Sequence, residues 1–165
     1  MSIARGIAVS AIALAATLGL SGCGSMGDHK IGDTAKVNFT KADSYEVTVT
    51  AIEPAPAAVA DRYETEDEIY FVRFTAKAAG VADPDLVQVT SNTYAVVEDG
   101  TVVATSFDTI EECAQPDNIE ATEKLKAGEP VEACVPVAGD DGKKVTGIRM
   151  GSHDLEASGS QTWKI

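Results

Sequence analysis

Long stretches of this 165-residue chain alternate between apolar and polar side chains, and this period of two residues restricts the fold more than any other feature. Residues 45–52 and 69–78 show it best. Their apolar positions, which share one face in each segment, are Tyr45, Val47, Val49 and Ala51, then Tyr70, Val72, Phe74 and Ala76. Neighbouring side chains of a β-strand point to opposite faces, so both segments are predicted to be half-buried strands, with Phe71 on the polar face of the second.

Shorter segments continue the pattern toward the C-terminus. Residues 130–137, 144–150 and 161–165 are predicted strands. Residues 94–105 are predicted to form a hairpin, because two valine-rich runs flank Asp99-Gly100, the pair that a tight primed turn prefers. About eight short strands with turns between them favour an all-β fold, an antiparallel immunoglobulin-like β-sandwich, with a small barrel as the alternative.

Helix signals are weak in this sequence. Residues 118–129 are the best candidate, with Asn118 as a cap and Gly128 as a stop, for one or two helical turns between strands. Residues 53–68, which contain two prolines, are predicted to be a long exposed loop. Trp163 is expected in the core, because a sandwich usually buries one large aromatic side chain.

The first 22 residues have the composition of a secretory signal peptide. Arg5 precedes an uncharged run, residues 6–20, that is shorter than the roughly 20 apolar residues a membrane-spanning helix requires. The run leads into Leu20-Ser21-Gly22-Cys23, which resembles the lipobox of bacterial lipoproteins. The resemblance implies that Cys23 receives a diacylglyceryl group and that the chain is cut before it. The alternative is an ordinary secretory peptide with an incidental cysteine.

The lipobox interpretation divides the chain into a signal peptide (1–22), a lipidated cysteine with a flexible tether (23–33) and a domain (34–165). Residues 24–33 are small and polar, which is typical of a tether that lifts a domain off the membrane surface. His29 falls in this segment, and we expect it to be solvated rather than a metal ligand.

The cysteines support an extracytoplasmic location. Once Cys23 is assigned to the lipid, Cys113 and Cys134 remain as an even pair, which is expected to form a disulfide in an oxidising compartment. A zinc site is the alternative. It would need further ligands, and the sequence has no Cys-x-x-Cys motif or histidine cluster to supply them.

The charge of the chain restricts its partners. Without residues 1–22, 26 acidic side chains face 12 basic ones, which gives a formal charge of −14. So acidic a protein is not expected to bind nucleic acid, whose phosphates would repel it, or to lie flat on anionic lipid. We expect a membrane partner through the lipid on Cys23, an envelope or extracellular protein as a further partner, and no cofactor.

Acidic residues crowd the segment 61–68, DRYETEDE. Calcium takes six to eight oxygen ligands, and this stretch would offer the carboxylates of Glu64, Glu66, Asp67 and Glu68, with Asp61 nearby. The spacing is not that of an EF-hand, so a site would need help from another loop, such as Asp83 and Asp85. The simpler interpretation is a solvated acidic loop.

No catalytic signature is present in the sequence. Residues 151–154, GSHD, place Ser, His and Asp side by side, but adjacent side chains cannot form a triad and no Gly-x-Ser-x-Gly turn occurs. His153 is therefore expected to be an exposed loop residue, and the protein is expected not to be an enzyme.

Three pieces of the chain carry a family resemblance: Ile31-Gly32-Asp33, the apolar strand 69–76, and LKAGEPVEACVPV (125–137). They resemble the immunoglobulin-like domain of unknown function found on Gram-positive lipoproteins and secreted proteins, whose relatives include small secreted mycobacterial antigens. The family often has Asn before the glycine that ends its second strand, whereas this chain reads Lys77-Ala78-Ala79-Gly80. The resemblance implies the fold and carries no agreed activity.

Together these observations predict a membrane-anchored extracytoplasmic lipoprotein that acts as a surface-displayed interaction module. The alternative is a lipoprotein that binds a divalent cation such as calcium, or a small solute.

Overall fold

Each segment with the alternating pattern folds as a strand in the computed structural model, which describes residues 27–40, 43–63, 65–105, 107, 109–151 and 159–165. The strands are β1 (Asp28–Lys30), β2 (Thr34–Asn38), β3 (Ser44–Pro54), β4 (Ile69–Ala78), β5 (Thr93–Val97), β6 (Val102–Val103), β7 (Val131–Ala138), β8 (Val145–Met150) and β9 (Gln161–Lys164).

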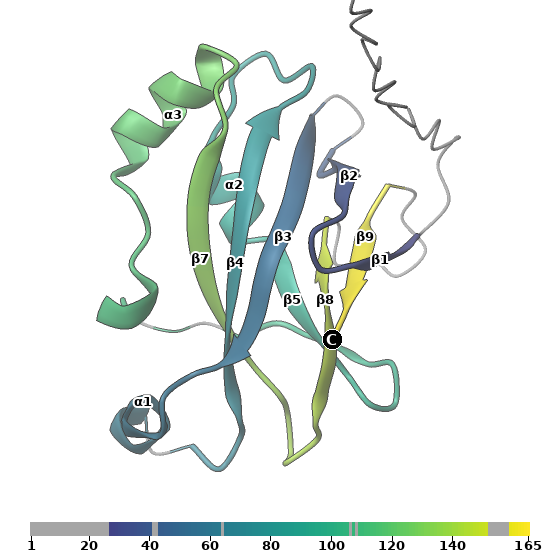
Figure 1. Cartoon of the computed structure of the whole chain (residues 1–165), viewed down its shortest axis with the longest axis vertical. Helices are drawn as coiled ribbons and strands as arrows, with labels where there is room; N and C mark the ends of the chain where they lie inside the picture. Colours follow the sequence, from purple (N-terminus) through teal and green to yellow (C-terminus); the bar gives the residue numbers. More distant parts are fainter. Residues whose placement is uncertain (1–26, 41–42, 64, 106, 108, 152–158) are drawn as a thin grey trace, which may run out of the picture.

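The strands form two sheets that pack face to face (Figure 1). One sheet has the order β1-β9-β8-β5-β6 and the other the order β2-β3-β4-β7. β1 and β9 run parallel, and the other strand pairs are antiparallel. The prediction of an all-β antiparallel sandwich is confirmed, and two separate sheets replace the alternative of a barrel.

The main core lies between the two sheets. Its largest fully buried side chains include Trp163, Tyr45, Phe74, Ile148 and Met150. Trp163 is in the core as expected, and its indole Nε1–H donates to the carbonyl oxygen of Asp33 at 3.1 Å. This bond satisfies the one polar atom of the indole, so the ring is buried without leaving an unpaired donor.

The pairing register of β3 changes partway along the strand. Val49 pairs with Phe74 and Ala51 with Arg73, so Thr50 is an extra residue in β3. Ile52 therefore enters the core while Ala51 is half-buried, and the prediction that Ala51 shares the face of Val49 is wrong. A bulge adds one residue to the strand. Because side chains alternate between the two faces, the residues after the bulge face the opposite side from the one that regular alternation predicts.

A second, smaller apolar cluster lies on the outer face of the β2-β3-β4-β7 sheet. Its buried members are Val59, Ile69, Phe71, Ile110, Cys113, Cys134 and Ala138. Phe71 points away from the main core, as predicted, yet it is buried because helix α1 (Ala57–Tyr63) and the segment around Ile110 cover it. The loop predicted over 53–68 thus contains a helix, and the fully buried Val59 attaches it to the sheet.

Two further helices connect the strands. The predicted helix at 118–129 is present as α3 (Asn118–Lys126), but its cap is Asp117, whose carboxylate accepts from the N–H groups of Ile119 and Glu120. Helix α2 (Leu86–Thr90) was not predicted, and the carboxylate of Asp85 caps it by accepting from the N–H of Val87.

The turn between β5 and β6 differs from the predicted type. Gly100 has a positive φ of 82°. Asp99 does not, because among the described non-glycine residues a positive φ is found at Asp141. The N–H of Gly100 donates to the carbonyl oxygen of Val97, and the N–H of Val97 donates to the carbonyl oxygen of Thr101. These bonds define a three-residue loop, residues 98–100. A primed two-residue turn needs positive φ at both central residues, and Asp99 does not supply it.

The expected tether is partly folded. Asp28–Lys30 forms β1, whose His29 pairs in register with Trp163 of β9. The Nε2 atom of His29 lies 2.8 Å from the side-chain oxygen of Gln161, and its ring centroid lies 5.3 Å from that of Trp163. The prediction of a solvated His29 in a flexible segment is therefore wrong for residues 28–30. Pairing with a strand more than 130 residues away is invisible to local composition.

No helix in the described ranges is long and apolar enough to cross a bilayer.

Candidate functional site

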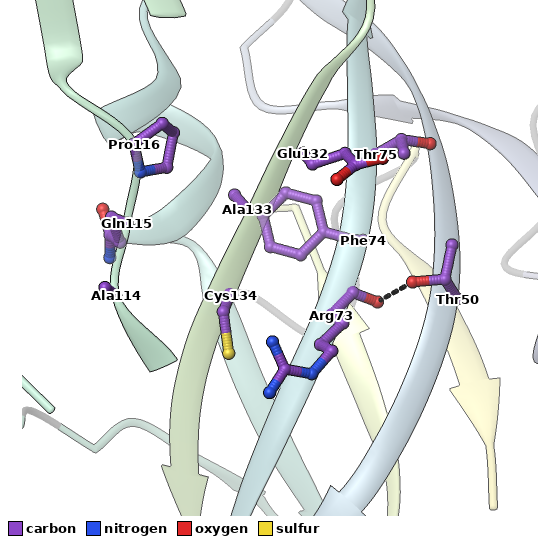
Figure 2. A pocket seen from close by; sticks show the side chains of 10 residues that line it. All are labelled: Thr50, Arg73, Phe74, Thr75, Ala114, Gln115, Pro116, Glu132, Ala133 and Cys134. Carbon is purple, nitrogen blue, oxygen red and sulfur yellow. Dashed lines mark hydrogen bonds between the residues drawn. The ribbon is translucent and has the colours of Figure 1, made fainter. Parts of the chain in front are cut away.

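A hollow of about 560 Å³ opens on the outer face of the β2-β3-β4-β7 sheet, beside the smaller apolar cluster (Figure 2). The sheet contributes one side of it and residues 114–116 the other. We name this hollow the outer groove, and its polar and ring-bearing lining includes Thr50, Arg73, Thr75, Gln115, Pro116 and Glu132.

The alternation of the strands places these side chains. Arg73 and Thr75 are the odd-numbered residues of β4, opposite in direction to the core residues Phe74 and Ala76. Thr50 occupies the bulge of β3, and its hydroxyl donates to the carbonyl oxygen of Arg73 at 3.1 Å (Figure 2). The bulge therefore turns a hydroxyl toward the groove at a point where regular pairing is interrupted.

A disulfide attaches the other wall of the groove to the sheet. Cys113 ends the short helix η1 (Glu111–Cys113), and it is bonded to Cys134 of β7 with 5.2 Å between their Cα atoms. Cys134 points away from the core face that carries Val131 and Val135, as the sequence predicted. Residues 114–116 follow directly, so the disulfide sets where this wall begins.

Charged contacts hold the base of the same wall. Arg62 of α1 donates two bonds of 2.8 Å to the carboxylate of Glu112, and this hydrogen-bonded pairing lowers the pKa of Glu112. Arg73 bonds to the carboxylate of Glu53 at 2.8 Å and to the carbonyl of Glu112 at 3.3 Å. Side chains from α1 and β4 therefore meet at η1 and orient the groove.

Glu132 gives the groove an available charge. It is exposed on β7, and the ion pairs among the described residues do not include it. Thr75 is its partner on β4, and the hydroxyl of Thr50 and the amide of Gln115 also line the groove. These groups donate and accept hydrogen bonds, and the carboxylate favours a ligand with a positive group.

The acidic residues of the proposed calcium site take separate partners. Asp67 accepts from the N–H of Gly142 and Glu68 from the hydroxyl of Tyr70, each at 2.8 Å. Asp83 pairs with Lys126, while Asp85 caps α2. Within the described residues no three His, Cys, Asp or Glu side chains gather as metal ligands.

The structure therefore does not bring Glu66, Asp67 and Glu68 into one site. Glu64, the fourth proposed ligand, lies outside the described residues. So do Cys23 and His153, and the lipidation of Cys23 stays a prediction.

The outer groove was not predicted from the sequence. Arg73 offered one signal, since it is a cation in the middle of a strand that is otherwise mostly apolar. Glu132 and Gln115 gave no signal in the sequence. The groove lies between the sheet and residues 114–116, and only the tertiary fold places these segments next to each other.

Comparison with known proteins shows what this architecture is similar to. No family model matches the chain, and no curated protein matches it. Among solved structures, it is similar to MPT63, a secreted protein from Mycobacterium tuberculosis, with a TM-score of 0.50 and 14% identity over 86% of this chain and 98% of that one. At this identity the likeness shows the fold alone, and it confirms the immunoglobulin-like β-sandwich.

Proposed function

We propose that this protein is an extracytoplasmic lipoprotein, anchored through Cys23, whose immunoglobulin-like domain binds a protein partner through the outer groove. The role is one of binding rather than catalysis. The observation that carries the binding role is the outer groove itself, which combines a disulfide-held wall with the available carboxylate of Glu132.

Three observations support the location. Residues 1–22 have the composition of a signal peptide, and the Leu20-Ser21-Gly22-Cys23 motif resembles a lipobox. Disulfides such as Cys113–Cys134 persist in oxidising compartments outside the cytoplasm. MPT63, to which this fold is similar, is a secreted protein.

The anchor is tested with Cys23→Ala. One acyl chain binds a membrane weakly and two or more bind it stably, so the wild-type protein is expected in the detergent phase after phase partitioning. The variant is expected in the medium or as an unprocessed precursor. Intact-mass measurement identifies the lipid on the mature chain. A wild-type protein without lipid and in the aqueous phase would contradict the anchor.

The groove is tested by photo-crosslinking in living cells. A photoreactive residue at Gln115, in the wall of the groove, is expected to form a defined adduct, and Glu132→Gln is expected to reduce its yield because the available charge is lost. Lys36 is the matched control, since it is exposed on β2 at the opposite edge of the same sheet. The same adducts at both positions, or none at Gln115, would show that the groove is not the docking surface.

A further inference from the structure

The first strand among the described residues begins close to the proposed lipid anchor. β1 starts at Asp28, five residues after Cys23. Five residues span at most about 17 Å even when fully extended. β1 is paired with β9 and belongs to the sandwich, so a lipid on Cys23 would hold the domain against the membrane rather than lift it away.

The two sides of the sandwich lie at different distances from this point. β1 and β2 are edge strands of the two sheets, and β2 contacts β9, so they lie on one side. β6 and β7 are the opposite edges, β7 contacts β5, and α3 lies beyond β7 (Figure 1). Four strand spacings separate β1 from β6, which is about 19 Å.

The charges of the two sides differ in sign. Residues 27–38 and 161–165, which hold β1, β2 and β9, carry three lysines and two aspartates: Lys30, Lys36, Lys164, Asp28 and Asp33. Lys164 is ion-paired with Asp28, so the excess positive charge of this side comes from Lys30 and Lys36 against Asp33. Residues 111–129, which hold η1 and α3, carry six carboxylates and two lysines: Glu111, Glu112, Asp117, Glu120, Glu123, Glu129, Lys124 and Lys126. The net charge of the chain is strongly negative, so an anionic bilayer attracts only the first side and repels the second.

Exposed aliphatic side chains add to this asymmetry. Lys30 and Lys164 are partners in the parallel register of β1 and β9, so Ile31 and Ile165 follow at the same end of the two strands. Ile31 is 41% exposed and Ile165 is 58% exposed. Isoleucine side chains flanked by lysines suit the boundary between lipid headgroups and acyl chains, where the aliphatic part is buried and the ammonium groups stay hydrated.

We propose that the β1-β2-β9 side of the sandwich is the membrane-facing surface and contacts the lipid bilayer that holds the anchor. This inference rests on the proposed lipidation of Cys23. It places β7, α3 and the wall of the outer groove on the side turned away from the membrane, where a partner can reach them.

Fluorescence quenching in vesicles tests the orientation. Lipid and the disulfide occupy all three native cysteines, so Ile31→Cys or Ile119→Cys adds one free thiol for a small fluorophore. The two positions are matched, since both are exposed isoleucines, and Ile119 lies on α3 with 73% exposure. The lipidated full-length protein is reconstituted into phosphatidylcholine vesicles with a minor share of phosphatidylglycerol and a headgroup nitroxide.

Several-fold stronger quenching at position 31 than at position 119 is the expected result. Lys30→Glu combined with Lys36→Glu is expected to reduce the quenching at position 31, because it removes the attraction to phosphatidylglycerol. Unchanged Trp163 fluorescence verifies that each variant is folded, since the indole is buried.

The outcomes separate the orientation from the anchor. Equal quenching at both positions, or stronger quenching at position 119, would overturn the proposal of a membrane-facing surface. If the same protein floats with the vesicles, the proposed lipid anchor is still supported. Native protein that carries no lipid and does not float would overturn both.

Discussion

Asp99 illustrates how single side chains hold the turns of this sandwich. Its carboxylate accepts from the N–H of Thr101 at 2.9 Å and from the Lys143 ammonium at 3.0 Å, which connects the β5-β6 turn to the segment before β8. Bonds from the Thr101 hydroxyl and amide, and then from Lys143, hold the pKa of Asp99 well below its ordinary value. The ionised form is therefore the one that the folded state favours.

Replacing Asp99 by Asn is expected to destabilise the protein most at neutral pH. Since the folded pKa is lower than the unfolded value of 3.8, the carboxylate contributes fully above that value and progressively less as the pH falls through the folded pKa. Urea unfolding at pH 7 and pH 3 should show the difference between wild type and variant narrowing at the lower pH.

Glu98→Gln is the matched control for this prediction. Glu98 is exposed next to Asp99, and its side chain has no hydrogen bond or ion pair among the described residues. An equal loss in both variants, or a loss in Asp99→Asn that does not depend on pH, would contradict the role given to the carboxylate.

At the scale of elements, one covalent bond joins the wall of the outer groove to the sheet. The Cys113–Cys134 disulfide connects η1 to β7 across 21 residues of sequence, and α3 lies within the closed loop. Helix α1 adds the Arg62–Glu112 ion pair, but exposed ion pairs contribute little to stability. The disulfide is thus the main constraint on this wall.

Cys113→Ser combined with Cys134→Ser is expected to lower the free energy of unfolding by about 3 kcal/mol, the chain-entropy value for a loop of this size. Hydrogen exchange at the amide of residue 113, which donates to the carbonyl oxygen of Ile110, should become faster, while that of the core strand β8 should change only in proportion to global stability.

The reduced wild-type protein serves as the control for the double variant, because it has the same freedom with native side chains. Agreement between the two is expected. Unchanged stability and unchanged exchange at the amide of residue 113 would show that other contacts hold the wall.

At the scale of the whole molecule, β1 forms one edge of the β1-β9-β8-β5-β6 sheet, although its residues were expected to belong to a flexible tether. β1 is three residues long. The side-chain oxygen of Gln161 lies 3.2 Å from the backbone nitrogen of Gly27 and 2.8 Å from Nε2 of His29, and it forms a hydrogen bond with each. His29 also covers the Trp163 ring. The sandwich therefore includes Asp28–Lys30 in addition to residues 34–165.

A chain of residues 34–165 is expected to be less stable than a chain of residues 27–165. Deletion of residues 27–33 removes the two hydrogen bonds to the Gln161 side chain and the bond from the Trp163 indole to the carbonyl oxygen of Asp33, which contribute about 3 kcal/mol together, at about 1 kcal/mol each. Loss of the His29 contact should also shift Trp163 emission to longer wavelength. Denaturant unfolding followed by fluorescence measures both effects.

His29→Ala in the longer chain separates the side chain from the strand. It should reproduce part of the loss, since it removes one hydrogen bond and the ring contact. Equal stability of the two chain lengths would mean that β1 does not contribute to the fold.

The sequence by itself determined the strands, the β-sandwich and the cysteine pair. Alternation in segments such as 45–52 and 69–78 reports directly which face is buried, because a strand must place neighbouring side chains on opposite faces. The helix at 118–129 was recognisable for a similar reason, since a cap and a stop lie within one short stretch.

The tertiary structure alone decided the bulge at Thr50, the helices α1 and α2, the strand β1 and the outer groove. α1, α2 and β1 have seven, five and three residues, too few to show a period of their own. Each is held by contacts with distant residues, such as Val59 with Phe71 or His29 with Gln161. Burial against a distant partner is not encoded in local patterns, so these elements and the groove they shape became visible only when the two sheets were assembled.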